Sequence, residues 1–191
     1  MQAEDNTDEI GTLISKVAAA DAAAFRLLWD RLAGRLTAFG TRYLGSHEDG
    51  QDLTQETFLK IHRRASQFDP TKGTGTAWVF TIARNVARDR LRQQRLRWIV
   101  GLDDLPFAVT APAAGPEQQA VDRDTLAASH SAILDLPDAQ RMALLLATIG
   151  DVQTTEIARI MGKSRGSVEQ LIVRARKRLR AMTKENNDVG T

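Results

Sequence analysis

Apolar residues recur with helical spacing in two stretches of this chain, and a segment without that spacing separates them. Within 7–97, and again from about Glu117 to residue 184, apolar positions return every three or four residues, which is typical of amphipathic helices. Between 98 and 116, Gly, Pro and small residues replace that pattern, as in a linker. The sequence therefore predicts an all-α fold with two small helical domains, 7–97 and 117–184, joined by a flexible linker over 98–116.

Local capping signals divide the first domain into antiparallel helices. Thr7 and Asp21 are placed to cap its first two helices, and Gly45 to end the second. Ser46 and Asp49 resemble a capping box for a third helix, and Thr76 is placed to cap a fourth. The apolar sides of the second and fourth helices are expected in the core: Phe25, Leu28, Trp29, Leu32, Leu36, Phe39 and Tyr43, then Trp78, Val79, Ile82, Val86 and Leu91.

The second domain ends in two helices joined by a short turn. The first has one apolar face through Ile157 and Ile160, and Gly162 is placed to end it, because glycine takes a left-handed residue at no steric cost. Ser164 is placed to cap the next helix, which carries apolar residues at i, i+3, i+4 and i+7: Val168, Leu171, Ile172 and Ala175. This pattern predicts a helix-turn-helix, whose second helix is the candidate reader of a DNA major groove.

Basic residues gather on two of the predicted helices, although the formal net charge is only +2. One cluster lies on the last helix and its turn, where Glu169 is the single acid between 159 and 184. The other lies on the second half of the fourth helix: Arg84, Arg88, Arg90, Arg92, Arg95 and Arg97. Such clusters are the electrostatic footprint of phosphate contacts, although a solvated arginine face is the simpler alternative. Because motif and charge coincide on the last helix, we expect DNA binding there.

An acidic cluster lies at the start of the third helix, and spacing alone leaves two explanations for it. Glu48, Asp49, Asp52 and Glu56 are favourable near the positive end of a helix dipole, which is the simpler explanation. They also suit docking to a basic partner.

Composition argues against several other classes of protein. The chain has no cysteine, and its three histidines fall on different predicted elements without ligand spacing. Glu48, Asp52 and Glu56 have helical spacing but no facing set of metal ligands, so we expect no metal, no cofactor and no catalysis. No apolar run approaches the length of a membrane span, and the acidic N-terminus is unlike a secretory signal, which predicts a cytoplasmic protein without membrane insertion.

Two blocks of the sequence together resemble a known family. The first comprises the run from His47 to Arg64, then Phe68-Asp-Pro, then the run from Ala77 to Arg92; it looks like domain 2 of an extracytoplasmic-function sigma factor of the sigma-70 family. The second comprises Leu136-Pro-Asp-Ala-Gln-Arg, the run from Glu156 to Gly162, and the run from Gly166 to Arg176; it looks like domain 4. Both blocks occur in the family's order and spacing, so the resemblance is far more specific than a helix-turn-helix alone.

The resemblance implies roles for the first domain that composition does not give. One surface matches the family segment that grips the β′ clamp helices of RNA polymerase core: Asp49, Asp52, Leu53, Gln55, Glu56 and Phe58. This favours function over helix stabilisation alone for the acidic cluster. Phe68 and Asn85 match positions expected to form a pocket for a flipped base of the −10 element, with Arg84 and Arg88 on its phosphates. Stacking and hydrogen bonds to the base edge can offset the cost of extruding a base.

In the second domain, the resemblance implies that the last helix reads the −35 element. Glu169, Gln170, Val173 and Arg174 are the candidates for base contacts, and Lys163, Ser164, Arg165 and Lys177 complete the expected DNA-binding set. The implied partners are RNA polymerase core, through the β′ clamp helices and the β flap, promoter DNA, and an anti-sigma factor. Glu169 departs from the basic or neutral residues common at its position, so promoter preference does not transfer. Gly50 departs from the better helix formers common at its own position.

Two other functions remain alternatives. A stand-alone helix-turn-helix regulator would bind a duplex operator without polymerase. A protein-bridging adaptor would leave both basic helices unexplained.

Overall fold

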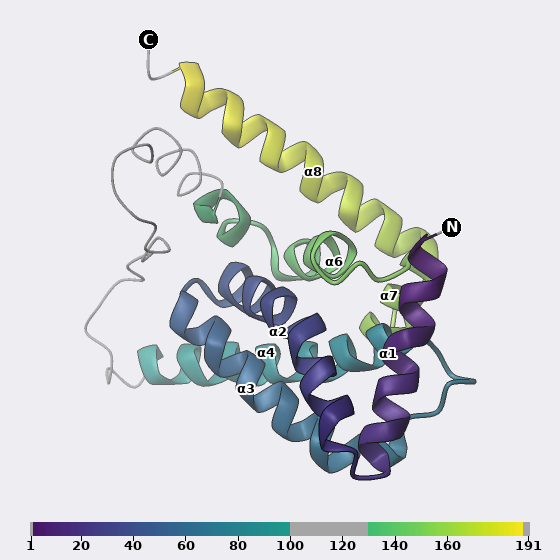
Figure 1. Cartoon of the computed structure of the whole chain (residues 1–191). Helices are drawn as coiled ribbons and strands as arrows, with labels where there is room; N and C mark the ends of the chain where they lie inside the picture. The colour runs from purple at the N-terminus through teal and green to yellow at the C-terminus, as the bar shows by residue number, and fades with distance from the viewer. Residues whose placement is uncertain (1, 100–129, 189–191) are drawn as a thin grey trace, which may run out of the picture.

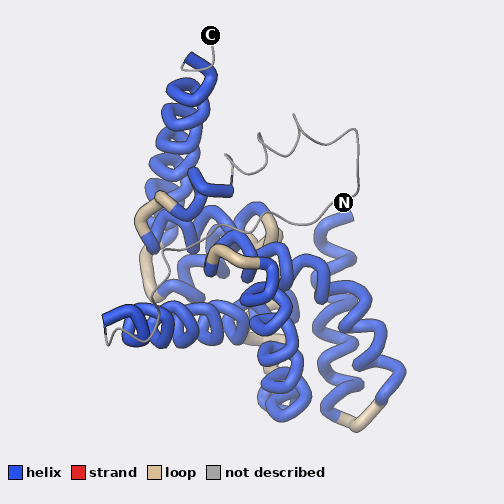
Figure 2. The backbone as a smooth tube through the Cα atoms, turned by 90° about the vertical axis from the view of Figure 1, so that its left-hand side faces the viewer, coloured by secondary structure: helices blue, strands red, loops and turns tan. Residues whose placement is uncertain are grey.

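The computed structural model describes residues 2–99 and 130–188, and every regular element in those ranges is helical (Figures 1 and 2). The first range holds α1 (Gln2–Ala18), α2 (Ala22–Leu44), α3 (His47–Arg64), the 3₁₀ turn η1 (Ala65–Gln67) and α4 (Gly75–Ile99). The second holds α6 (Asp138–Thr148), α7 (Thr154–Met161) and α8 (Arg165–Asp188). The predicted all-α fold is confirmed. Most of the predicted linker, and the helix expected from Glu117, lie outside the described residues; of that helix only 130–134 is described, and it is helical.

Three of the helix-end residues predicted in the first domain are confirmed as caps. The Asp21 carboxylate accepts the backbone N–H groups of Ala23 and Ala24, and Gly45 ends α2 in the left-handed conformation at φ 109°. Ser46 Oγ accepts the N–H of Asp49 at 3.0 Å and donates to its carboxylate at 2.6 Å. Each cap satisfies a backbone group that a helix end leaves without an intrahelical partner.

Two predicted caps are wrong, for different reasons. Thr7 lies inside α1, because nothing between Gln2 and Asp8 is a helix breaker and the helix begins earlier. Thr74, not Thr76, caps α4: its Oγ accepts the N–H of Ala77 at 3.2 Å. Thr74 is fixed by a carboxylate of the second domain, described below, and Thr76 is buried instead.

The core of the first domain lies between α1, α2, α3 and α4. Phe39 stacks with Tyr43 and meets Phe80 edge to face, with ring centroids 5.9 and 5.7 Å apart, and all three rings are fully buried. Phe80 was not predicted to lie in the core. It is buried because α4 contacts α1, α2 and α3 and therefore has more than one buried face, whereas a single apolar stripe was expected. Trp29, predicted to be core, is 38% exposed and leans on Phe58 with a centroid distance of 4.6 Å.

Gly50 has a packing reason that its low helix propensity conceals. A Cβ at this position would lie 2.6 Å from the carbonyl oxygen of Thr37 and 2.8 Å from the N–H nitrogen of Thr41, so α3 and α2 approach too closely there for any side chain. Gly40 faces Gly50 across the same contact. The close crossing of α2 and α3 therefore requires glycine at position 50, although glycine costs about 1 kcal/mol in helix propensity.

The two domains pack against each other. From α2, the Arg35 guanidinium donates to the carbonyl oxygens of Ile149 and Gly150, at 3.1 and 2.5 Å, beyond the end of α6. Arg141 of α6 donates to the carbonyl oxygen of Tyr43 at 2.8 Å. The ring nitrogen Nε2 of His130 lies 3.1 Å from the carbonyl oxygen of Thr41. Figure 1 shows α6 and α7 between the first domain and α8, so that α8 lies on the outer side of the molecule.

Candidate nucleic-acid interface

A helix-turn-helix forms the outer part of the second domain. Gly162 ends α7 in the left-handed conformation at φ 64°, and its N–H bonds back to carbonyls of α7. Ser164 Oγ then accepts the N–H of Ser167 at 3.2 Å, as expected of the cap of α8. Val168, Ile172 and Ala175 are buried on the side of α8 that faces α6 and α7. These contacts fix the direction of α8 and leave its opposite side in solvent.

The side chains predicted to contact the −35 element share this solvent side. All eight are exposed: Lys163, Ser164, Arg165, Glu169, Gln170, Val173, Arg174 and Lys177. Val173, the apolar member of this set, is 59% exposed. Arg165 and Glu169 form an i, i+4 ion pair at 2.8 Å, so each would have to leave the other to reach DNA.

The basic half of α4 borders a hollow of about 670 Å³. Asn85 and Arg88 are exposed along it, together with basic side chains from α3 and α4: Lys60, Arg64, Arg92 and Arg95. Arg84 is half-buried beside it and donates to Asn85 Oδ1 at 3.3 Å. Burial, and then the charge of Arg88, lower the pKa of the Arg84 guanidinium. Two carboxylates, Asp89 and Asp138, also line the hollow, but its basic side chains outnumber them, so it is a concave surface of net positive charge, suited to phosphate groups.

Phe68 and Asn85 line two different hollows. Phe68 is half-buried before α4, edge to face with Trp78 at a centroid distance of 5.7 Å, and it lines a different hollow beside Gly11 and Ser15 of α1. Phe68 packs against α1, where a Cβ on Gly11 would lie 3.2 Å from its ring. A base pocket shared by Phe68 and Asn85 stays a prediction.

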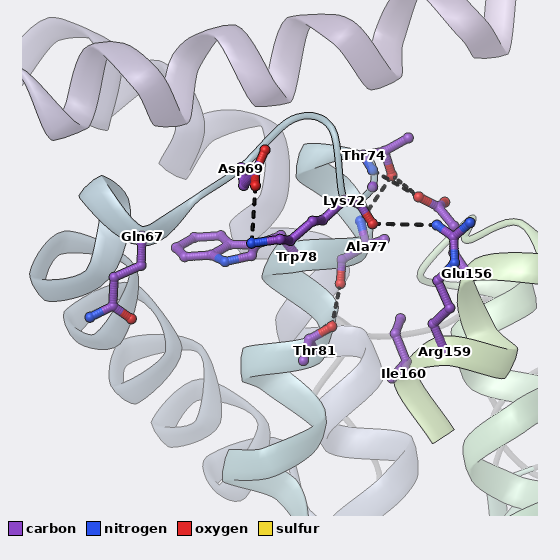
Figure 3. A pocket seen from close by; sticks show the side chains of 11 residues that line it. Gln67, Asp69, Lys72, Thr74, Ala77, Trp78, Thr81, Glu156, Arg159 and Ile160 are labelled. Atoms are coloured by element: carbon purple, nitrogen blue, oxygen red, sulfur yellow. Dashed lines mark hydrogen bonds and ion pairs between the residues drawn. The ribbon is translucent and has the colours of Figure 1, made fainter. Parts of the chain in front are cut away.

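The loop between Phe68 and α4 is held by two carboxylates (Figure 3). Asp69 accepts the N–H and Oγ–H of Thr71 at 3.0 and 2.7 Å and pairs with Lys72 at 3.0 Å. The hydrogen bonds from Thr71, followed by Lys72, lower the pKa of Asp69 to about 2. Glu156 of α7 reaches across from the second domain, and its Oε1 accepts both the N–H and the Oγ–H of Thr74 at 2.8 Å.

The acidic surface of α3 is partly paired within the chain. Arg90 of α4 donates to Asp52 at 3.1 Å and to Glu56 at 3.3 Å, and Lys60 also pairs with Glu56 at 2.9 Å. A guanidinium, rather than a metal-ligand set, therefore faces these carboxylates. In the described residues, no group of three or more His, Cys, Asp or Glu is placed to hold a metal ion.

Two members of the predicted polymerase surface are not at the surface. Leu53 is fully buried and Phe58 is 2% exposed, because both belong to the core stripe of α3. Asp52 and Gln55 are exposed, and Asp49 and Glu56 are half-buried. The accessible part of this surface is therefore polar, and Leu53 and Phe58 pack in the core beneath it.

Sequence reasoning missed the residues that join the domains. Arg35 gave no signal, and Arg141 was noted only as the end of the family motif that begins at Leu136, without a role in joining the domains. Burial lowers the pKa of both guanidinium groups, as expected for side chains taken out of water to reach carbonyl oxygens. Glu156 begins one of the family blocks, but nothing in the sequence indicated that it is buried, at 7% exposed, and bonded to the other domain.

The fold and these surfaces define a two-domain, all-α protein with a helix-turn-helix and a second basic concave surface. The sigma-70 region 2 family model matches residues 28–97, and the sigma-70 region 4 model matches residues 127–179. Within the described residues, no helix is both long enough and apolar enough to cross a bilayer.

Similar proteins carry the same family name. The ECF RNA polymerase sigma factor SigL of Mycobacterium tuberculosis is 30% identical over 172 residues, which cover 90% of this chain and 96% of SigL. BldN of Streptomyces coelicolor is 28% identical and SigE of Mycolicibacterium smegmatis 33% identical, and this chain spans 65% and 60% of their lengths. The chain belongs to the ECF RNA polymerase sigma factors, which confirms the resemblance drawn from its residues.

Solved structures show the same fold. The sigma factor RpoE of Bartonella quintana, solved with the anti-sigma factor NepR, has a TM-score of 0.68 at 25% identity and covers 84% of this chain and 96% of its own. CnrH, solved with the cytosolic domain of CnrY, has a TM-score of 0.70 at 24% identity and covers 93% of this chain and 99% of its own.

Proposed function

We propose that this chain is a promoter-specificity subunit that binds RNA polymerase core, directs it to promoters through −10 and −35 contacts, and helps to open the DNA. The observation that carries the proposal is the presence of two separate basic surfaces, on α4 and α8, within the two family regions of one chain. One domain with a single DNA-reading helix would account for only one of them.

The proposed division of labour follows these surfaces. Residues 7–97 bind polymerase and the −10 element, 117–184 bind the −35 element, and 98–116 connect them. On α8, Gln170, Val173 and Arg174 project to solvent from the side opposite the buried stripe and are the side chains that reach base edges. On α4, Asn85 contacts a base of the opened strand, and Arg84 and Arg88 contact phosphates.

Polymerase docking is assigned to the exposed acidic side of α3. Asp52 and Glu56 would exchange the Arg90 guanidinium for basic groups of the β′ clamp helices. The β flap is the proposed partner of the second domain. Because a solved neighbour of this fold is bound to an anti-sigma factor, we also propose an anti-sigma partner for this chain. The chain would act in the cytoplasm and catalyse no reaction of its own.

The proposal is tested by run-off transcription from a library of promoter fragments, using polymerase core with and without the protein. Defined transcripts that require both components are expected, and the selected fragments supply the promoter motif. Asp52→Asn should weaken core binding in a pull-down, whereas Asp30→Asn, which removes the same charge from an exposed residue of α2, should not. Duplex binding without any gain of transcripts would instead identify a stand-alone helix-turn-helix regulator.

A further inference from the structure

The side of α8 assigned to DNA carries one acid among basic and neutral side chains. Glu169 is exposed in the second turn of the helix, and its Oε1 accepts from Nε of Arg165 at 2.8 Å. Arg165, Glu169 and Val173 recur at i, i+4 and i+8, so they form one row along the helix. Within the described part of the chain, Arg165 is the only group bonded to the Glu169 carboxylate. The second carboxylate oxygen, Oε2, is therefore available as an acceptor.

The stability of the helix does not explain this pair. Arg165 is the first residue of α8, where the helix dipole disfavours a cation. An i, i+4 pair is also weaker when the base precedes the acid, which is the order found here. The two side chains are 67% and 49% exposed, and pairs of such exposure contribute little to stability. The fold therefore gains little from an acid on this side of α8.

The first turn of α8 is suited to close approach by another molecule. A Cβ on Gly166 would meet nothing within 4 Å, so packing inside the protein does not require glycine there. Its backbone does not require glycine either, because Gly166 is not among the described residues with a positive φ. Glycine at such a position leaves the backbone open to a ligand. Glu169 lies one turn beyond it, near the end of the helix that reaches base edges in a helix-turn-helix.

A carboxylate in the major groove discriminates between bases, because it accepts hydrogen bonds and donates none. Guanine N7 and O6 and thymine O4 are acceptors that repel it, whereas cytosine N4 and adenine N6 carry amino groups. Adenine N6 lies between two acceptors, its own N7 and O4 of the paired thymine. Cytosine N4 has an acceptor on one side only, O6 of the paired guanine. The carboxylate therefore favours cytosine over the other three bases.

We propose that Glu169 selects a cytosine at one position of the −35 element. On the duplex, Arg165 leaves Glu169 for a DNA phosphate, and the freed carboxylate accepts from the cytosine N4 amino group. The inference rests on the proposed function of α8 and adds a base preference to it.

The exchange of partners explains why both members of the pair are needed. The Arg165 guanidinium replaces one anion by another, so it keeps a charged acceptor throughout. Glu169 gains a replacement only where an amino group meets it. Opposite thymine or guanine, the carboxylate is desolvated without a donor, which penalises those sequences. In the free chain, the pair keeps this acid neutralised while α8 approaches the phosphates.

The first experiment determines base preference by selection. Holoenzyme assembled from polymerase core and the full chain selects from a promoter fragment randomised across its −35 region, and sequencing gives the enrichment at each position. Wild type should prefer cytosine about tenfold over thymine and guanine at one position, and Glu169→Ala should lose that preference at that position only. Glu169→Gln should favour adenine there, because an amide both donates and accepts. An unchanged cytosine preference in both variants would overturn the inference.

Two further variants separate base selection from charge. Asp30→Asn also removes one negative charge, from an exposed residue of α2, and should leave every base preference unchanged. Arg165→Ala should weaken binding to all sequences about equally and lower the salt dependence by about one phosphate contact, with the cytosine preference intact. If Arg165→Ala abolished the cytosine preference, the pair would act together on the base edges, and the proposed exchange would be wrong.

A second experiment removes the amino group instead of the carboxylate. The selected cytosine is replaced by 2-pyrimidinone, which lacks N4, and the affinity for each duplex is measured by fluorescence anisotropy. The ratio of the two affinities should be about tenfold larger for wild type than for Glu169→Ala. Comparing ratios cancels any effect of weakened base pairing in the modified duplex. Equal ratios in the two proteins would show that Glu169 and the cytosine amino group do not meet.

The outcomes distinguish base selection from the proposed function. If run-off transcription fails, the selection is repeated with the full chain alone, because a helix-turn-helix reads a duplex without polymerase. A cytosine preference that depends on Glu169 would then support the inference and reject the promoter-specificity subunit. If transcription succeeds but its −35 motif does not depend on Glu169, the proposed function stands and the inference fails.

Discussion

The two basic surfaces have similar composition but different surroundings. On α8, every side chain predicted to meet DNA is exposed, and the single acid among them is paired to its own helix neighbour. On α4, Arg84 is half-buried, Arg90 is engaged by carboxylates of α3, and Arg88 shares its hollow with Asp138 of the other domain. The α8 surface is therefore ready for a ligand, whereas the α4 surface is already partly occupied by the protein itself.

The difference teaches that basic charge alone does not define an available nucleic-acid surface. An arginine with a carboxylate beside it must lose one interaction to gain another, and only the surplus contributes to affinity. Mutations that act on one surface should therefore leave the other unchanged, and the following predictions test that separation.

The largest expected effect comes from Gly50→Ala, which affects only the first domain. The added Cβ would press on the backbone of α2, and we expect a loss of about 3 kcal/mol in the free energy of unfolding despite the better helix propensity of alanine. Thermal and urea denaturation would measure it. Gly34→Ala is the matched control, because a Cβ at Gly34 meets nothing within 4 Å. Equal stability of the two variants would contradict the close helix crossing.

Arg174→Ala should weaken the α8 surface alone. We expect a loss of about 2 kcal/mol in binding to a duplex selected in the transcription assay, because an exposed arginine on the groove-facing side contacts base edges or phosphates. Binding of single-stranded DNA, assigned to α4 in the proposed function, should not change. Arg176→Ala removes the same charge from the other side of α8 and serves as the control. A similar loss in both variants would mean that only overall charge matters.

Glu156→Gln should loosen the loop before α4. The neutral amide loses the charge-assisted part of two hydrogen bonds to Thr74, and we expect a cost of about 1 kcal/mol to the docked state. Faster hydrogen exchange at the Thr74 amide would report it. Glu169→Gln, an exposed acid of α8, should leave that amide unchanged. Unchanged exchange in Glu156→Gln would show that the loop does not depend on the second domain.

The smallest effect concerns pH and the loop carboxylate Asp69. Its pKa is lowered to about 2 by Thr71 and Lys72, so the folded loop holds the ionised form more strongly than the unfolded chain does. The stabilisation is present above the ordinary aspartate range and is lost as pH falls toward 2. Asp69→Asn should therefore reduce the dependence of the Thr71 amide exchange on pH between about 4 and 2, as measured by mass spectrometry. An identical profile in the variant would contradict this role.

Much of the fold follows from local chemistry that the sequence displays. Asp21, Gly45, Ser46 and Gly162 act within a few residues of their own positions, so their roles could be predicted without knowing the packing. The stripe Val168, Ile172 and Ala175 likewise predicted which side of α8 is buried, and therefore which side faces solvent. Family motifs added the functional assignment, because they carry information on partners that periodicity lacks.

The failed predictions share one cause. Trp29, Phe80 and Thr76 were misjudged because their surroundings are set by helices distant in sequence. A periodic pattern indicates that a helix has an apolar side, but it does not tell how many neighbouring helices cover it or where that coverage ends.

By itself, the sequence determined the helical class, most of the helix ends, the helix-turn-helix and the family, because these depend on short-range spacing and on motifs. Only the tertiary structure decided which charged residues are free. Asp138, Glu156 and Arg141 lie in family motifs, and Arg35 lies in an ordinary helical pattern. Neither kind of signal indicated their contacts with residues more than 80 positions away along the chain. Electrostatic and hydrogen-bond energies depend on distance and burial, and neither quantity can be read from the order of residues.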